Sequence, residues 1–269
     1  MKTTTCKNCN QKFKGNFCNN CGQSAHSHEL SIAYFWHEIQ HGILHVDKGI
    51  LFTTKELFTR PGYAIKDYIS GKRVSHFKPF AYIFILSSLY AVLAHFLKME
   101  ILLQGLSNGI GQSIKISTED AADVSKVKEV IQNIYSFLTW IKEHYPYTNV
   151  LSLPVFSLAS YIAFYKNGFN YFEHLILNSY IAGQRTVLFI LLLPVYYFIS
   201  DQHVLNIIDN CKTVVGIALI FWTFNQFFNS NKWSKNLRKT FVSFFYLILI
   251  VLIIVISVIV VIALIHFKV

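Results

Sequence analysis

Four cysteines near the N-terminus have the residue type and the spacing to bind a metal ion. Cys6 and Cys9 form one Cys-x-x-Cys pair and, eight residues further on, Cys18 and Cys21 form a second. Each pair can present two thiolates from one tight turn, and two such pairs are typical of a tetrahedral Zn²⁺ site. We therefore expect residues 1–23 to be a zinc ribbon whose structural Zn²⁺ has no open position. A disulfide, redox or iron–sulfur role is the alternative.

Three histidines could form a second polar or metal site. His37, His41 and His45 recur every four residues, so one helix would carry them in a stripe, and Asp47 follows just beyond. Two histidines four residues apart can chelate one metal ion, and a carboxylate can complete such a site. The alternative is the polar face of a helix that lies at the membrane surface.

Glu173 and His174 stand side by side where a later apolar run begins. A carboxylate beside an imidazole could bind a cation, relay a proton or join the histidine stripe in one site. Alternatively, Glu173 caps the N-terminus of its helix, where the helix dipole favours a carboxylate.

The remaining chain is too apolar for an ordinary soluble protein. Hydrophobic residues make up 53% of its 269 residues and charged residues only 14%, which is typical of a membrane protein. Five runs approach or exceed the length of about 20 residues that crosses a bilayer. These runs lie at residues 79–97, 147–165, 175–200, 211–228 and 240–266. The sequence predicts an all-α polytopic membrane protein, with residues 79–269 as its transmembrane domain.

Polar residues interrupt the third run at Asn178, Gln184 and Arg185. A charge near the middle of a bilayer is costly and is usually paired or faces a cavity. These three residues could therefore line a membrane cavity. Alternatively, residues 171–184 form an amphipathic helix on the surface and the crossing begins near Thr186.

Residues 31–78 have the pattern of amphipathic helices on the inner face of the membrane. Thr53-x-x-Glu56 matches a capping box and predicts the start of a short helix. Arg60-Pro61-Gly62 should end this helix, and a second helical segment follows it. A basic belt in this segment comprises Arg60, Lys66, Lys72, Arg73 and Lys78. We expect it to bind anionic lipid headgroups, with a phosphorylated ligand as the alternative and no nucleic acid as a partner.

The distribution of charge predicts the orientation. Residues 1–78 hold eleven Lys or Arg and five Asp or Glu, whereas residues 99–146 hold four and six. The positive-inside rule then places the N-terminus in the cytoplasm, residues 99–146 outside and, after five crossings, the C-terminus outside.

Apolar residues that recur at intervals of three and four predict a helix over residues 117–145. This helix either folds back on the protein or pairs two copies as a homo-oligomer. We expect no internal repeat.

Several short motifs resemble an uncharacterised family of bacterial inner-membrane proteins, a domain of unknown function. They are Cys18-x-x-Cys21-Gly22-Gln23, Asp47, Thr53-Thr54-x-Glu56-Leu57, Arg60-Pro61-Gly62, Tyr68-Ile69-x-Gly71-Lys72-Arg73, Pro79 and Phe172-Glu173-His174. The resemblance covers residues 6–90 well and the rest loosely. It implies a zinc ribbon, a basic amphipathic stretch and several membrane helices, but it implies no reaction.

These patterns leave three functions open. In the first, which we expect, the protein is not an enzyme and its cytoplasmic ribbon recruits or anchors a protein partner. In the second, it is a transporter or pore lined by the polar residues of the third run. In the third, it is a membrane-embedded metal enzyme that uses the histidine stripe with Glu173 and His174. Neither GxxxxGK[ST] nor GxGxxG is present, so nothing favours nucleotide hydrolysis.

Overall fold

The computed structural model describes residues 3–25, 49–97, 136, 140, 144–199, 201–228 and 233–266. The histidine stripe and the predicted helix over residues 117–145 therefore fall outside the described residues, except for Ser136, Trp140, His144 and Tyr145 at the end of that range. The elements in chain order are β1 (Thr3–Thr5), β2 (Lys12–Lys14), α2 (Gly49–Thr59), α3 (Pro61–Ile69), α4 (Pro79–Phe96), α7 (Tyr145–Phe164), the 3₁₀ turn η1 (Tyr165–Asn167), α8 (Tyr171–Phe198), α9 (Gln202–Phe228) and α10 (Trp233–His266).

Five of these helices, α4, α7, α8, α9 and α10, are long and apolar enough to cross a membrane. The predicted all-α membrane fold with an N-terminal cysteine cluster is thereby confirmed. Four helices begin earlier than predicted, and the difference is largest for α9, which begins at Gln202, and for α10, which begins at Trp233. Polar residues in these extra turns find partners inside the protein, since Asp209 pairs with Lys212 and Lys239 donates to Asn167 Oδ1.

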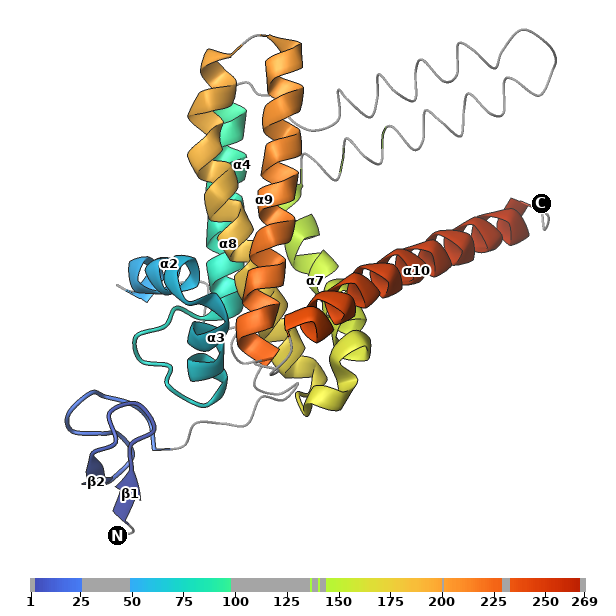
Figure 1. Cartoon of the computed structure of the whole chain (residues 1–269). Helices are drawn as coiled ribbons and strands as arrows, with labels where there is room; N and C mark the ends of the chain where they lie inside the picture. Colours follow the sequence, from blue (N-terminus) through green and yellow to red (C-terminus); the bar gives the residue numbers. More distant parts are fainter. Residues whose placement is uncertain are drawn as a thin grey trace, which may run out of the picture.

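Helix α8 is the central element of the bundle. It packs against α4, α7 and α9, and also against α2 and α3. Figure 1 shows α4, α8 and α9 standing side by side, with α2 and α3 next to their lower halves and α10 leaving at an angle. Residues 174–181 of α8 are all buried, so this part of the helix is not exposed on the surface of the protein, and the alternative that the crossing begins near Thr186 stays a prediction.

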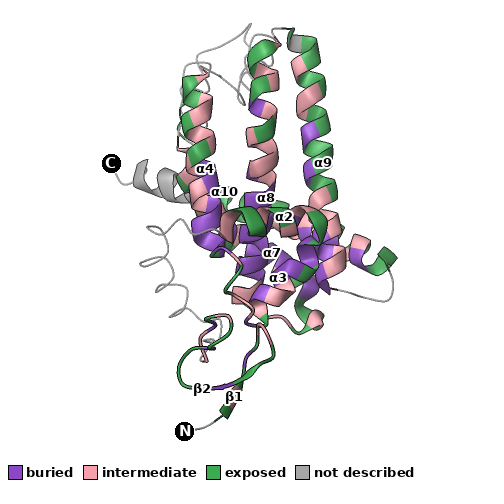
Figure 2. Ribbon diagram, turned by 90° about the vertical axis from the view of Figure 1, so that its left-hand side faces the viewer, coloured by how far each residue is buried: buried purple, intermediate pink, exposed green. Residues whose placement is uncertain are grey.

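The core lies in the lower half of the bundle, where Figure 2 shows the buried residues gathered around α2, α3, α7 and α8. Three tyrosines form its centre: Tyr180 has its ring 5.5 Å from that of Tyr68 and 6.1 Å from that of Tyr82. The Tyr180 hydroxyl donates to the Phe77 carbonyl at 2.6 Å. Aromatic packing and one buried hydrogen bond therefore join α3, α4 and α8.

Helix α2 corrects one prediction, because it begins at Gly49 rather than at a capping box on Thr53. Thr53 lies inside the helix, only 1% exposed, and its Oγ accepts the Phe77 N–H at 2.7 Å. The Thr53 hydroxyl thus satisfies a buried backbone donor of the loop that leads to α4. The two residues are distant in sequence, so no local pattern predicts this contact.

Candidate metal centre and intramembrane cavity

The four N-terminal cysteines converge on one point. The Sγ atoms of Cys6 and Cys21 are 3.5 Å apart, as are those of Cys9 and Cys18, and all four lie within 4.8 Å of one another. Sulfurs placed 2.3 Å from a tetrahedral Zn²⁺ would be about 3.8 Å apart, so the cluster fits such an ion. A disulfide needs about 2.05 Å, and all four cysteines are free. The site can hold a metal ion through four thiolates.

The two turns that carry the cysteines are copies of one another. The Cys6 N–H donates to the Gln11 carbonyl at 2.9 Å, and the Asn10 N–H donates to the Cys6 carbonyl at 3.0 Å. The second turn repeats both bonds twelve positions later, at 2.8 Å each. Asn10 and its counterpart Gly22 both have positive φ, 61° and 74°. The chain therefore contains a short repeat, Cys-x-Asn-Cys-x-Gln, and the expectation of no repeat is wrong.

Backbone N–H groups stabilise two of the thiolates. The Gln11 N–H is the main cause that lowers the pKa of Cys9 to about 6, and the Gln23 N–H likewise lowers the pKa of Cys21. Burial instead raises the pKa of the Cys6 thiol to about 11. Metal binding at this site must therefore displace a proton from Cys6, because thiolates rather than thiols are the ligands.

Two asparagines cross between the turns. The side chain of Asn20, in the second turn, bonds to Cys9 in the first, and the side chain of Asn8, in the first turn, bonds to Cys21 in the second. Groups that bond to metal ligands orient them and tune their affinity for the metal. The predictions missed these asparagines, although their equal position in the repeat is a signal that could have identified them.

Gln23 connects the ribbon to the helices. Its side chain is 5% exposed, and its Oε1 accepts the Arg73 N–H at 3.2 Å. Arg73 in turn donates from Nε to the Tyr68 carbonyl at 3.2 Å, and its guanidinium lies 5.3 Å from the Tyr68 ring centroid. The ribbon motif and the loop after α3 are thus in contact.

Glu173 and His174 have separate roles among the described residues. The Glu173 carboxylate accepts the Asn170 N–H at 2.7 Å, and the Asn170 side chain accepts the Glu173 N–H at 2.9 Å, which is a complete capping box. His174 is fully buried, with Nδ1 2.9 Å from Ser160 Oγ and its ring 5.6 Å from that of Phe228. Glu173 therefore caps α8, the second of the two roles considered for it.

The other proposed partners of that pair cannot be placed, since His37, His41, His45 and Asp47 lie outside the described residues. The same segment holds a further pattern, because His37-Glu38-x-x-His41 has the HExxH spacing. On a helix this spacing puts two histidines on one zinc ion, with the glutamate as general base. The interpretation as a histidine stripe leaves Glu38 out.

A second catalytic pattern also lies outside the described residues. Gly105-x-Ser107-x-Gly109 has the GxSxG spacing of a serine nucleophile on a strand-to-helix turn. That motif needs a supporting sheet, and the described part of the chain has only the two-stranded sheet of the ribbon. The described residues outside the ribbon therefore supply no sheet for this pattern.

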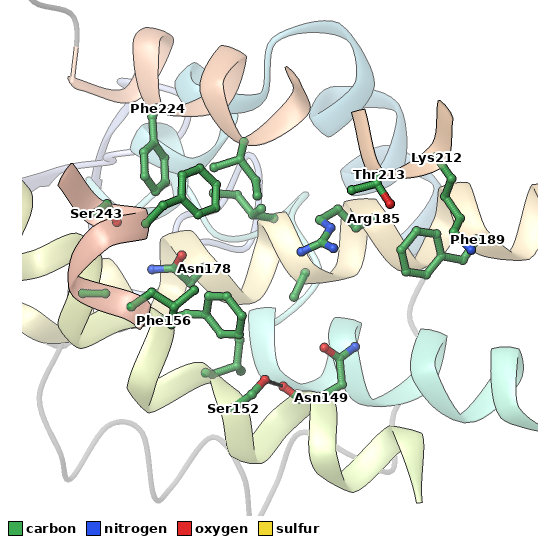
Figure 3. A pocket seen from close by; sticks show the side chains of 17 residues that line it. Asn149, Ser152, Phe156, Asn178, Arg185, Phe189, Lys212, Thr213, Phe224 and Ser243 are labelled. Atoms are coloured by element: carbon green, nitrogen blue, oxygen red, sulfur yellow. Dashed lines mark hydrogen bonds between the residues drawn. The ribbon is translucent and has the colours of Figure 1, made fainter. Parts of the chain in front are cut away.

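A cavity of about 360 Å³ lies between α7, α8, α9 and α10 (Figure 3). Asn178 and Arg185, two of the three polar residues expected to line a cavity, are in its wall. Gln184 is elsewhere: its side chain is fully buried and its Nε2 donates to the Leu57 carbonyl of α2 at 2.7 Å. Lys212 of α9, which the predictions did not single out, adds a second cation to the wall.

The basic belt contains ion pairs. Arg60 contacts Glu56 at 2.5 Å and Asp67 at 3.2 Å, and Lys72 contacts Asp67 at 2.7 Å. Burial acts to raise the pKa of Asp67, but the bond from Lys72 and the charges of Lys72 and Arg60 hold it below its usual value. Lys66 lies 5.9 Å from the Phe227 ring centroid, and Lys78 precedes α4. Binding of lipid headgroups by this belt remains a prediction.

Together these features define a membrane-spanning helical protein with an N-terminal four-cysteine cluster. The sequence model of one family, described as "Protein of unknown function (DUF3667)", matches residues 47–91. That stretch covers α2, α3 and most of α4, and it stops short of the cavity and the cysteine cluster. No curated protein and no solved structure matches the chain.

Proposed function

We propose that this is a non-enzymatic membrane protein whose zinc ribbon recruits a protein partner to the cytoplasmic face of a bacterial inner membrane. The four converging sulfurs carry this proposal. They would occupy all four positions of a tetrahedral Zn²⁺, which leaves none for substrate or water. A closed site of this kind supplies folding energy rather than catalysis.

The surface of the ribbon suits binding. Phe17 is 64% exposed, and Lys12 and Lys14 nearby in the chain are exposed as well. An aromatic anchor next to cations fits a partner segment that offers an apolar pocket flanked by acidic residues. The cytoplasmic location rests on the basic residues before the first span, because Lys and Arg are retained on the inner side.

A photo-crosslinking residue in place of Phe17 tests recruitment in the cells that produce the protein. We expect one protein adduct, which disappears when Cys6→Ser and Cys9→Ser unfold the ribbon. The matched control is a crosslinker at Tyr165, which is 65% exposed but lies in η1. Adducts with lipid alone, or the same protein adduct from both positions, would contradict recruitment by the ribbon.

A metal enzyme is the second candidate, and the HExxH spacing at residues 37–41 favours it. Such an enzyme binds two zinc ions per chain, one in the ribbon and one at His37 and His41. His41→Ala would then remove one equivalent, whereas Glu38→Gln would keep the metal and abolish activity. A single zinc in the wild-type protein, lost completely in the ribbon variant, rules this candidate out.

A further inference from the structure

The cavity has a cationic end. Arg185 and Lys212 approach the same aromatic ring, with the Arg185 guanidinium 5.8 Å and the Lys212 ammonium 5.4 Å from the Phe189 centroid. Figure 3 shows both side chains toward one end of the cavity. Among the described residues that line the cavity, no aspartate or glutamate is present. Asp209 pairs with Lys212 from outside the lining, so two cations and one carboxylate leave this end of the cavity with a net positive charge, which favours an anion.

The protein holds both cations in place. The Lys212 side chain is 9% exposed, pairs with Asp209 and donates to the Tyr196 hydroxyl at 2.9 Å. Arg185 lies against Gly216 of α9, where an added Cβ would be 3.4 Å from its Nε. The glycine leaves room for the guanidinium, and the tyrosine and the aspartate fix the ammonium.

These cations lie deep in the bundle. Arg185 lies fourteen positions after the start of α8 at Tyr171, and Lys212 lies sixteen positions before the end of α9 at Phe228. At 1.5 Å per residue, both lie about 21–24 Å from that end of the bundle. Charged residues at such depth are rare and usually mark a site that binds or moves a polar substrate.

The amide donors in the cavity wall are committed to the protein. Asn178 Nδ2 donates to Ser160 Oγ at 2.9 Å and to the His174 carbonyl at 2.8 Å. Asn149 Nδ2 donates in the same way to hydroxyls of α4 and α8, at 2.8 and 3.3 Å. Recognition of a charged ligand therefore falls to the two cations rather than to the amides.

The rest of the wall suits an apolar chain. Beyond Arg185, Figure 3 shows the cavity continuing along α8 toward Phe156 and Phe224, and Phe244 and Leu247 of α10 also line it. Its volume of about 360 Å³ is near the lower end of the range for ligand pockets, about 300–1,000 Å³. A single acyl or prenyl chain suits this size better than a complete two-chain lipid.

We propose that the cavity binds an anionic amphiphile, with its phosphate or carboxylate at Arg185 and Lys212 and a single apolar chain along α8. The proposal does not depend on recruitment by the ribbon. Loss of the ribbon partner would leave binding of the amphiphile unchanged, so an experiment can contradict one proposal without contradicting the other.

Three probes test the proposal on the full chain in nanodiscs of phosphatidylcholine, below the concentration at which the amphiphiles form micelles. Dodecyl phosphate has both the anion and the chain, dodecanol has only the chain, and inorganic phosphate has only the anion. We expect dodecyl phosphate to bind about tenfold or more tightly than either control, because charge-assisted hydrogen bonds add to the burial of the chain. Equal binding of dodecanol, or equal binding of inorganic phosphate, would overturn the proposal.

Variants locate the site. Arg185→Gln should weaken binding of dodecyl phosphate about tenfold, whereas Arg185→Lys should retain most of it. Thr213→Trp should also weaken binding of dodecyl phosphate, because Thr213 lines the cavity. Thr213 is exposed, so the helix can accept the larger side chain at this position. Val214→Trp is its control, on the same helix and 66% exposed, but outside the lining. Unfolding temperatures identify variants that do not fold. If the Arg185 variants do not fold, the comparison of Thr213→Trp with Val214→Trp decides whether the amphiphile binds in the cavity. Unchanged binding in Thr213→Trp, or an equal loss in Val214→Trp, places the amphiphile elsewhere and contradicts the proposal.

Discussion

At the scale of residues, the cysteine spacing was sufficient to predict the four-cysteine cluster, which could hold a metal ion, but not the groups that support it. Two Cys-x-x-Cys pairs define where the thiolates are in each turn. The way in which the turns face one another decides which asparagine reaches which sulfur, and no local spacing rule contains that relation. Asn8 and Asn20 thus each bond to a cysteine of the other turn.

Asn20→Ala should weaken zinc binding about tenfold or more, because loss of a group that bonds to a ligand typically costs 10–100-fold in metal affinity. Competition with a chromophoric chelator measures the change. Asn19→Ala is the matched control, since Asn19 is an exposed neighbour in the same turn. Equal affinities in the two variants would mean that the Asn20 side chain does not support the site.

The cavity was predictable only in part. Arg185 interrupts an apolar run and so indicated a polar lining. Lys212 lies close to the expected start of its span at residue 211, where a basic residue is typical of the membrane border. Because α9 begins at Gln202, Lys212 instead lies inside the bundle, paired with Asp209. Asp209 lies three residues before Lys212 on the same helix, so this pair is local in sequence, whereas the bond from Lys212 to the Tyr196 hydroxyl of α8 becomes visible only when the helices are assembled.

At the scale of elements, α3 and α9 pack closely at one glycine. A Cβ on Gly62 would lie 2.3 Å from the Phe227 N and 2.6 Å from the Gln226 carbonyl carbon. The Gly62 N–H also donates to Gln226 Oε1 at 3.1 Å. This close approach gives a physical reason for the Arg-Pro-Gly motif: the proline begins α3 and the glycine lets it contact α9.

Gly62→Ala should therefore destabilise the protein by about 1–3 kcal/mol, because backbone atoms of α9 must move to admit the methyl group. Thermal unfolding in detergent measures the loss. Gly216→Ala provides the comparison, since its Cβ would meet nothing closer than 3.4 Å. If both variants lose the same stability, the close contact between α3 and α9 is not the cause.

The α2–α3 layer should also respond to pH through His76. Its ring meets those of Phe52 and Tyr68 edge-on, with centroids 5.3 and 6.2 Å away. Burial lowers the pKa of His76 below its ordinary value of 6.5, partly opposed by the carboxylates of Asp67 and Glu56. The unfolded segment then binds more protons than the folded one, so stability is complete above pH 6.5 and falls as the pH decreases below it.

Hydrogen exchange of α2 and α3 at pH 7.5 and pH 5.5 measures this effect once each rate is divided by the intrinsic exchange rate at the same pH, and we expect smaller protection factors at the lower pH. Asp67 does not interfere, because its pKa lies below its usual value and it stays ionised in this window. His76→Gln should remove most of the difference between the two pH values. A difference of the same size in the variant would assign the effect to another group.

At the scale of the whole molecule, α10 has the most apolar span of the five helices that could cross a membrane. Its apolar residues beyond the bundle are well exposed, for example Ile248 at 66% and Leu252 at 55%. A continuous apolar surface of this kind needs lipid or a partner around it. Length and hydropathy were enough to predict this helix and the other four, because crossing a bilayer demands both of them regardless of how the helices pack.

The arrangement of the helices makes the orientation testable in two separate steps: whether residues 25 and 235 lie on the same side of the membrane, and which side that is. The ribbon contacts the loop before α4 through Gln23 and Arg73, and Lys239 at the start of α10 contacts Asn167 at the end of η1. With α4, α7, α8 and α9 each crossing once, residues 25 and 235 must lie on the same side of the membrane. The basic residues decide which side that is, because residues 229–239 contain four Lys or Arg and no acid.

Fusions of a phosphatase and of a fluorescent protein at residues 25, 120 and 235 read out both steps, and we expect residues 25 and 235 inside and residue 120 outside. Residues 25 and 235 on opposite sides would contradict five crossings. Both of them outside, with residue 120 inside, would leave the fold intact and contradict the charge rule. If the charge rule sets the orientation, replacing the four basic residues at 232–239 by glutamine should weaken it, since basic residues are retained on the cytoplasmic side of a membrane.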